Sequence, residues 1–132
     1  MSYKIIVDSC GELSPEMKAS GHFATASLAI DVDDYHVIDD ETFNQKEFLE
    51  KVAASPNCPK SSCPSPDTYM EKYHCDADHV YAVTLSAELS GSYNSAVLGV
   101  DLYKEEYGEK KIHVFNSKSA SIGETLIAMK IA

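Results

Sequence analysis

The sequence predicts an α/β fold in which helices flank a mainly parallel sheet. Two observations predict it. Short apolar runs alternate with stretches whose apolar residues recur at helical spacing, and residues 80–85 form a continuous apolar run. Such a run is typical of a central parallel strand buried on both faces. Strands separated by helices imply right-handed crossovers and parallel neighbours. With 132 residues the chain can form one domain, which would bury about two thirds of its unfolded surface.

The amino-terminal half predicts, in order, a strand at residues 5–7, a helix from Ser14, a strand at 28–32, a returning strand at 35–38 and a helix from Asn44. Ser14 precedes Pro15, which is the pattern of a helix N-cap with proline at the first helical position. Asp33-Asp34 can close a hairpin between two alternating segments. Asn44, with Glu47 three residues later, has the form of a capping pair.

The carboxy-terminal half predicts, in order, a loop at 55–66, a helix from Ser65, a strand at 80–85, a helix after Gly91, a strand at 112–115 and a helix from Ser121. The loop is rich in Pro, Ser and Cys, and Ser65-Pro66 repeats the cap-then-proline pattern. Tyr93 opens a helical apolar periodicity that runs to Tyr107. Ser121 and Glu124 match a capping box, so we expect Ser121 to cap the last helix.

Composition limits the possible partners. The formal net charge is −10, which disfavours binding to nucleic acid and to anionic membrane surfaces. No stretch approaches the roughly 18 consecutive apolar residues of a membrane span, so no stable membrane insertion is expected. Residues 1–4 lead directly into a strand and leave no room for a secretion signal. We therefore expect a cytoplasmic protein.

The four cysteines form no C-x-x-C pair. A zinc site could recruit Cys58, Cys63 and Cys75 with His74, but zinc ligands usually have tighter paired spacing. We therefore expect free thiols, no metal site and no cofactor. Nucleotide-binding motifs (G-x-G-x-x-G and the Walker lysine motif) and the G-x-S-x-G elbow are also missing.

Serine residues gather where the predicted strands end. Ligands of open parallel sheets bind beyond the carboxyl ends of the strands. The loops expected at that edge contain the candidate ligand-binding residues Ser9, Ser61, Ser62, Ser90, Gly91, Ser117 and Ser119. Hydroxyls and helix N-termini together suit a carboxylate or phosphate. Taken singly, each serine is equally typical of a cap or a turn. Asp8 could act as a base or nucleophile there, or it could simply orient the loop.

The same loops resemble the DegV family. The matching segments are Ile6-Val7-Asp8-Ser9, Ser61-Ser62-Cys63-Pro64-Ser65-Pro66, Leu89-Ser90-Gly91-Ser92-Tyr93-Asn94-Ser95-Ala96 and Val114-Phe115-Asn116-Ser117-Lys118-Ser119-Ala120-Ser121. They occur in the family's order and spacing, and together they cover the whole chain. The chain therefore resembles the amino-terminal domain of a DegV-like protein, occupying residues 1–132, with the family's second domain absent.

The resemblance implies a carrier, not an enzyme. Members of the family bury one long-chain fatty acid between two domains and present its carboxylate to a fatty acid kinase in bacteria. Ser61 matches the family's usual threonine and Ser90 its carboxylate-binding serine. Two departures stand out: Cys63 occupies a position where glutamine is common, and Asn116 replaces a frequent aspartate.

Two alternatives remain open at this point. One is a small-molecule phosphotransferase or hydrolase that uses Asp8, by analogy of fold with dihydroxyacetone-kinase-like proteins. The other is a protein-interaction module. The final predicted helix is still apolar at Ala132, so the chain looks like part of a longer protein, and an exposed apolar face would favour self-association.

Overall fold

The computed structural model describes residues 1–132 and confirms the α/β fold. Its main sheet has four strands, all parallel, in the order β2-β1-β6-β7. The strands are β1 (Tyr3–Asp8), β2 (Phe23–Ala26), β6 (His79–Thr84) and β7 (Lys111–Asn116). The apolar run predicted as a central strand is β6, which lies between β1 and β7 and is buried over most of its length.

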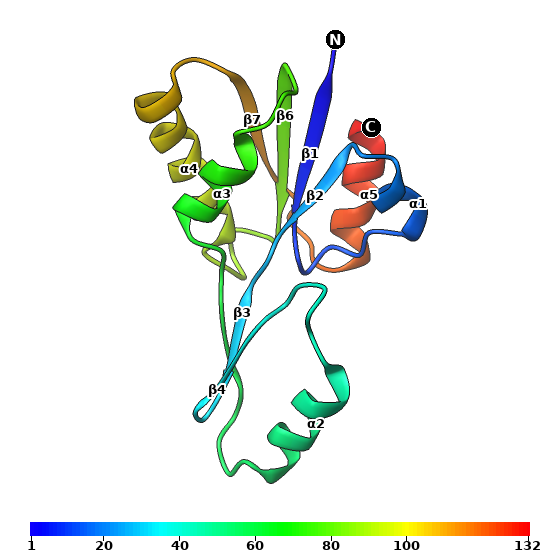
Figure 1. Cartoon of the computed structure of the whole chain (residues 1–132), viewed down its shortest axis with the longest axis vertical. Helices are drawn as coiled ribbons and strands as arrows, with labels where there is room; N and C mark the ends of the chain where they lie inside the picture. The colour runs from blue at the N-terminus through cyan, green and yellow to red at the C-terminus, as the bar shows by residue number, and fades with distance from the viewer.

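Helices cover both faces of this sheet. They are α1 (Pro15–Ala19), α3 (Pro66–Tyr73), α4 (Ser92–Tyr107) and α5 (Ile122–Ile131). Figure 1 shows α3 and α4 on one face and α1 and α5 on the other. Alternate side chains of β1 therefore enter two different cores. Ile6 packs with Tyr69 and Tyr73 beneath α3 and α4, whereas Ile5 and Val7 pack with residues of α5.

A second, smaller sheet extends away from the first (Figure 1). It is antiparallel, with the order β4-β3-β5, and is accompanied by helix α2. The elements are β3 (Ala29–Val32), β4 (Tyr35–Ile38), α2 (Gln45–Ala54) and β5 (Lys60–Ser62). The predicted hairpin is confirmed: Val32 pairs with Tyr35, and Asp33 adopts a left-handed φ of 51° in the turn.

Three of the four predicted helix caps form. Ser14, Asn44 and Ser65 each accept a hydrogen bond from the backbone N–H three residues later, so these three caps are confirmed. The prediction for Ser121 is wrong. Its φ of 53° and ψ of −124° lie outside the extended region that an N-cap needs, and its side chain makes no capping bond.

Two strands were not predicted. β2 was not recognised, and β5 lies within the segment 55–66 that was expected to be a loop. None of the helices combines the length and apolarity needed to cross a bilayer. All four cysteines are free thiols, and no three His, Cys, Asp or Glu side chains are grouped as a metal site would require.

Candidate functional site

The turn between β6 and α4 contains Ser90 and Gly91. Ser90 Oγ accepts a hydrogen bond from the Ser92 backbone N–H at 3.2 Å, and it donates none. Gly91 is the N-cap residue of α4 and provides no side-chain cap. The next two backbone N–H groups, of Tyr93 and Asn94, have no hydrogen-bond partner. This turn therefore presents a free hydroxyl proton and two free amides at the positive end of a 16-residue helix.

The end of β5 approaches this turn. Cys63 Sγ lies 3.7 Å from Ser95 Oγ, and a β-carbon on Gly91 would be 3.3 Å from the same sulfur atom. Gly91 therefore allows close packing against the segment that follows β5. Ser61 and Ser62 immediately precede this contact, both are exposed, and neither hydroxyl has a partner. Successive residues of a strand point to opposite faces, so only one of the two can face the turn.

The other three candidate serines differ in their surroundings. Ser9 Oγ accepts a hydrogen bond from the Leu28 backbone N–H at 2.9 Å. Ser117 Oγ accepts from the Ser119 N–H and donates to the Ser119 carbonyl, so its proton is engaged within its own turn. Ser119 Oγ packs closely against Gly123, where a β-carbon would be only 1.9 Å away. Of the six candidate serines, only Ser117 therefore has its proton engaged within the protein, and the hydroxyls of Ser9, Ser61, Ser62, Ser90 and Ser119 remain free to donate.

Asn116 keeps the hydrogen bonds that an aspartate could make there. Its Oδ1 accepts from the backbone N–H groups of Ala87 and Lys118, both at 3.1 Å. Both bonds need only an acceptor oxygen, which Asn and Asp share. One of them ties the end of β7 to the loop that leads to Ser90.

Asp8 lies at the carboxyl end of β1 and is fully buried. Its Oδ2 accepts hydrogen bonds from the Leu85 backbone N–H and from Ser92 Oγ, both at 2.8 Å. Tyr69 OH lies 2.6 Å from Ser92 Oγ. A nucleophile or general base has to reach its substrate, and the buried Asp8 side chain instead orients the loops that carry Ser90. Of the two roles considered from the sequence, the structure supports the orienting one.

Sequence reasoning missed the partners in this network. The sequence places Ser92 in the serine-rich turn after the central strand without predicting its bond to Asp8, it gives no sign of Tyr69 as a partner, and it predicts Glu124 only as part of a capping box. Glu124 is in fact fully buried in the first turn of α5. Its place in a mostly apolar helix was the only sequence signal that could have singled it out.

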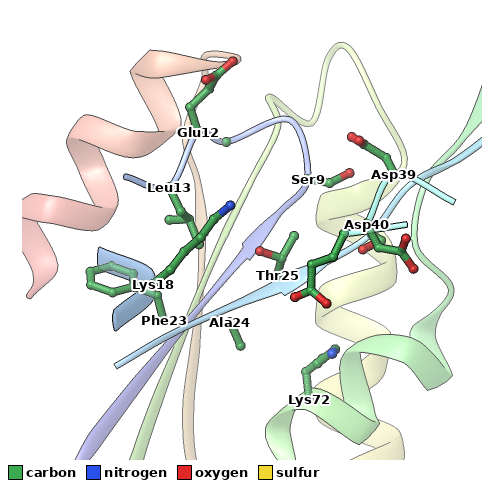
Figure 2. A pocket seen from close by; sticks show the side chains of 13 residues that line it. Ser9, Glu12, Leu13, Lys18, Phe23, Ala24, Thr25, Asp39, Asp40 and Lys72 are labelled. Carbon is green, nitrogen blue, oxygen red and sulfur yellow. The ribbon is translucent and has the colours of Figure 1, made fainter. Parts of the chain in front are cut away.

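A groove of about 680 Å³ opens beside β2, between the main sheet and the segment after β4 (Figure 2). Of the predicted site residues, only Ser9 lines it. Figure 2 shows charged side chains of both signs around it, Lys18 and Lys72 with Asp39 and Asp40. Just three of its 13 lining residues are hydrophobic, so this groove does not suit an acyl chain, which requires an apolar lining.

Comparison with known proteins gives consistent matches. A family model described as an uncharacterised protein of the DegV family matches residues 2–132. A DegV domain-containing protein of Streptococcus pneumoniae is 35% identical over 133 residues, which cover 99% of this chain and 47% of that protein. The chain thus spans about half the length of the curated relatives it matches.

Two solved structures show the same arrangement. A DegV family protein from Ruminococcus gnavus, refined with vaccenic acid, is 66% identical with a TM-score of 0.96, covering 99% of this chain and 47% of that one. The fatty acid kinase B3 protein of Streptococcus pneumoniae, loaded with linoleic acid, is 34% identical with a TM-score of 0.83 and the same two coverages.

Proposed function

The chain belongs to the DegV family, and we propose that it binds a long-chain fatty acid as a carrier, holding the acyl carboxylate at the Ser90 turn. Solved relatives carry vaccenic and linoleic acid. The chain covers 47% of each of those proteins. Fatty acid binding by an intact protein that contains this chain is therefore part of the proposal.

The observation that carries the proposal is the unused hydrogen-bonding capacity of the turn. Ser90 Oγ already accepts from the Ser92 N–H, so its own proton is available to an acceptor. The free N–H groups of Tyr93 and Asn94 lie at the same helix end. A carboxylate offers two acceptor oxygens and a negative charge, which match these donors and the helix dipole.

Ser61 is proposed as the second hydroxyl donor. The contact of Cys63 with Ser95 and its proximity to Gly91 bring the end of β5 to the first turn of α4. The serines of β5 therefore approach the same region as Ser90, with no competing partner in the protein. Ser62 takes this role if it is the residue whose side chain faces the turn.

The acyl tail is proposed to supply most of the affinity, at about 0.8 kcal/mol per buried methylene group. The groove beside β2 is mainly polar, so the tail should lie elsewhere. We propose that it is enclosed between this domain and a second domain of the intact protein.

As a carrier, the protein would present the exposed head group to a fatty acid kinase in the cytoplasm and would catalyse no reaction itself. One relative is named as a fatty acid kinase component. The buried position of Asp8 disfavours the alternative of a phosphotransferase or hydrolase that uses this residue.

The test is to identify what the intact protein carries. The protein is purified without added lipid, denatured, extracted and measured by mass spectrometry against a known amount of protein. We expect about one long-chain fatty acid per molecule. An extract that holds no fatty acid, together with no uptake of added oleic acid, would overturn the proposal and favour a protein-interaction module.

A further inference from the structure

Two carboxyl groups are buried together at the base of the Ser90 turn. Asp8 ends β1 and Glu124 lies in the first turn of α5, and both residues are 0% exposed. Asp8 Oδ2 has two donors, but Asp8 Oδ1 and both Glu124 oxygens have none. A buried charge without a partner is strongly unfavourable, so the pair needs a compensating group.

No cation supplies that compensation. The only ion pair in the structure joins His36 and Asp31 at the exposed end of the small sheet. The other titratable groups around the carboxyls are Cys10, in the loop after β1, and Tyr69, on α3. Burial raises the pKa of both, and neither brings a positive charge. A single proton shared between the two carboxyls is the remaining way to satisfy them.

Glu124 is the natural holder of this proton. Burial raises the pKa of Glu124 to about 9, and the neighbouring Asp8 carboxylate acts in the same direction. The Ser121 backbone N–H, which does not reach hydrogen-bonding geometry with either oxygen, opposes this only weakly. Protonated Glu124 can donate to the Asp8 oxygen that otherwise has no donor.

With Glu124 protonated, every hydrogen bond that Asp8 makes through its side chain is donated to it. Ser92 Oγ donates to Asp8 Oδ2, so its proton is used, and Tyr69 OH must be the donor to Ser92 Oγ at 2.6 Å. The Ser92 backbone N–H in turn donates to Ser90 Oγ. Asp8 therefore fixes Ser92, and Ser92 fixes the oxygen of Ser90, which leaves the Ser90 proton free for a ligand.

We propose that Glu124 is a positioning residue that shares a proton with Asp8 and so holds the Ser90 turn in its binding geometry. The link to Ser90 rests on the proposed fatty acid function, whereas the shared proton does not. Ionisation of Glu124 would place two charges in the core and loosen the anchor of Ser92. Both stability and binding should therefore decline as the pH rises.

The first test is the unfolding equilibrium of the protein between pH 6 and pH 8. The folded pKa of Glu124 is about 9 and its ordinary value is 4.5, so the folded state keeps a proton that the unfolded chain has lost. The contribution of Glu124 is fully present below pH 4.5 and is lost as the pH rises through 9. Between pH 6 and pH 8 the loss of this contribution should raise the unfolding equilibrium constant about tenfold per pH unit.

The variant Glu124→Gln separates this effect from others. Its amide can donate to Asp8 but cannot ionise, so it should remove most of that tenfold slope. The matched control is Glu12→Gln, since Glu12 is an exposed acid near the same sheet edge and should leave the slope unchanged. An equal slope in the protein with Glu124 and in the Gln variant would overturn the shared proton.

A second measurement needs no variant and holds even if Glu124→Gln fails to fold. Carbon-13 NMR of the glutamate carboxyl groups in the unaltered protein should show one group that remains protonated at pH 7. If every glutamate carboxyl is ionised at pH 7, the proposal is wrong.

The link to Ser90 is tested with oleic acid as the probe, bound to the intact protein at pH 7 and pH 9. The fatty acid itself titrates in the same way whichever protein is present. The difference between the unaltered protein and Glu124→Gln in their loss of affinity from pH 7 to pH 9 therefore reports on Glu124 alone. We expect the unaltered protein to lose severalfold more affinity than Glu124→Gln. Equal losses would overturn the positioning role and leave the shared proton intact. If the unaltered protein binds no oleic acid, the proposed function fails, and the unfolding data alone still decide the shared proton.

Discussion

Ser92 Oγ donates a hydrogen bond to Asp8 Oδ2 over 2.8 Å, although 84 positions separate the two residues in the sequence. The bond ties the first residue of α4 to the end of the central strand β1. The turn with the free donors of Ser90, Tyr93 and Asn94 is therefore anchored to the sheet. A donor group that is fixed before the ligand arrives loses less conformational entropy on binding.

Replacing Ser90 should weaken fatty acid binding. In Ser90→Ala a buried carboxylate would lose one donor, at a cost of about 1–3 kcal/mol. Ser90→Thr keeps the hydroxyl and should retain most of the affinity. Calorimetry of the intact protein with oleic acid measures both. The control is Ser20→Ala at the far end of α1, whose hydroxyl bonds only within its own turn. Unchanged affinity in a folded Ser90→Ala protein would rule out Ser90 as a head-group ligand.

Ser61 is expected to act on the same carboxylate as Ser90. If so, the losses in Ser61→Ala and Ser90→Ala should not add in the double variant, because both hydroxyls contact one group. The same calorimetry measures the double-mutant cycle, and Ser55→Ala, in the segment after α2, serves as the control. Ser62→Ala decides the facing residue. An effect at Ser62 with none at Ser61 would show that the assignment is wrong by one residue.

Gly99 should be required for the packing of α3 against α4. A β-carbon at Gly99 would lie 2.9 Å from both the Pro66 carbonyl oxygen and Tyr69 Cβ. Helix propensity favours alanine by about 1 kcal/mol, but overpacking a buried contact costs about 1–3 kcal/mol. We expect Gly99→Ala to be destabilising in urea unfolding. The adjacent exposed Leu98 gives the control, since Leu98→Ala should change stability by about 0.5 kcal/mol or less. A more stable Gly99→Ala protein would contradict the close helix contact.

The 132-residue chain by itself should fold cooperatively, self-associate and bind fatty acid weakly. Three apolar side chains of α5 are exposed, Ile122, Leu126 and Met129, with Leu126 at 61%. Burying them against a second molecule would be favourable. Leu126→Lys should reduce self-association in analytical ultracentrifugation. Leu49→Lys on α2 is the matched control, because Leu49 is 55% exposed but lies on another helix.

Calorimetry of the same chain with oleic acid completes that prediction. Tight one-to-one binding by a monomer would show that this domain binds the fatty acid without a second domain. In that case the two-domain form of the carrier proposal would be wrong.

Much of the fold could be predicted because its signals are local. The caps at Ser14, Asn44 and Ser65 depend on residues within one helical turn. The apolar run of β6 predicts a strand whichever strands it pairs with in the sheet. β2 gave no such signal, since Phe-Ala-Thr-Ala is short and becomes a strand by pairing with β1. β5 is entirely polar and exists through its ladder with β3.

The site was predictable only in part for the same reason. The rule that ligands bind beyond the carboxyl ends of parallel strands predicts that the serine-rich loops lie together, and hydrogen bonds do join the loops after β1, β6 and β7. It could not separate Ser117, whose proton bonds within its own turn, from Ser90, whose proton is free. The contacts of Asp8 with Ser92 and Glu124 join parts of the chain that are far apart in the sequence, so no local sequence pattern predicts them.

The position of β1 inside the sheet also affects how the protein is made. β1 pairs with β2 on one side and with β6 on the other, and β6 ends only at Thr84. All three strands of the small sheet are complete by Ser62. During translation the small sheet can therefore assemble first, while one edge of β1, with its apolar residues at 5–7, stays uncovered on the ribosome. An open apolar strand edge invites pairing with other chains. This edge of β1 is therefore a place where the nascent chain can pair with other chains until β6 emerges and closes it.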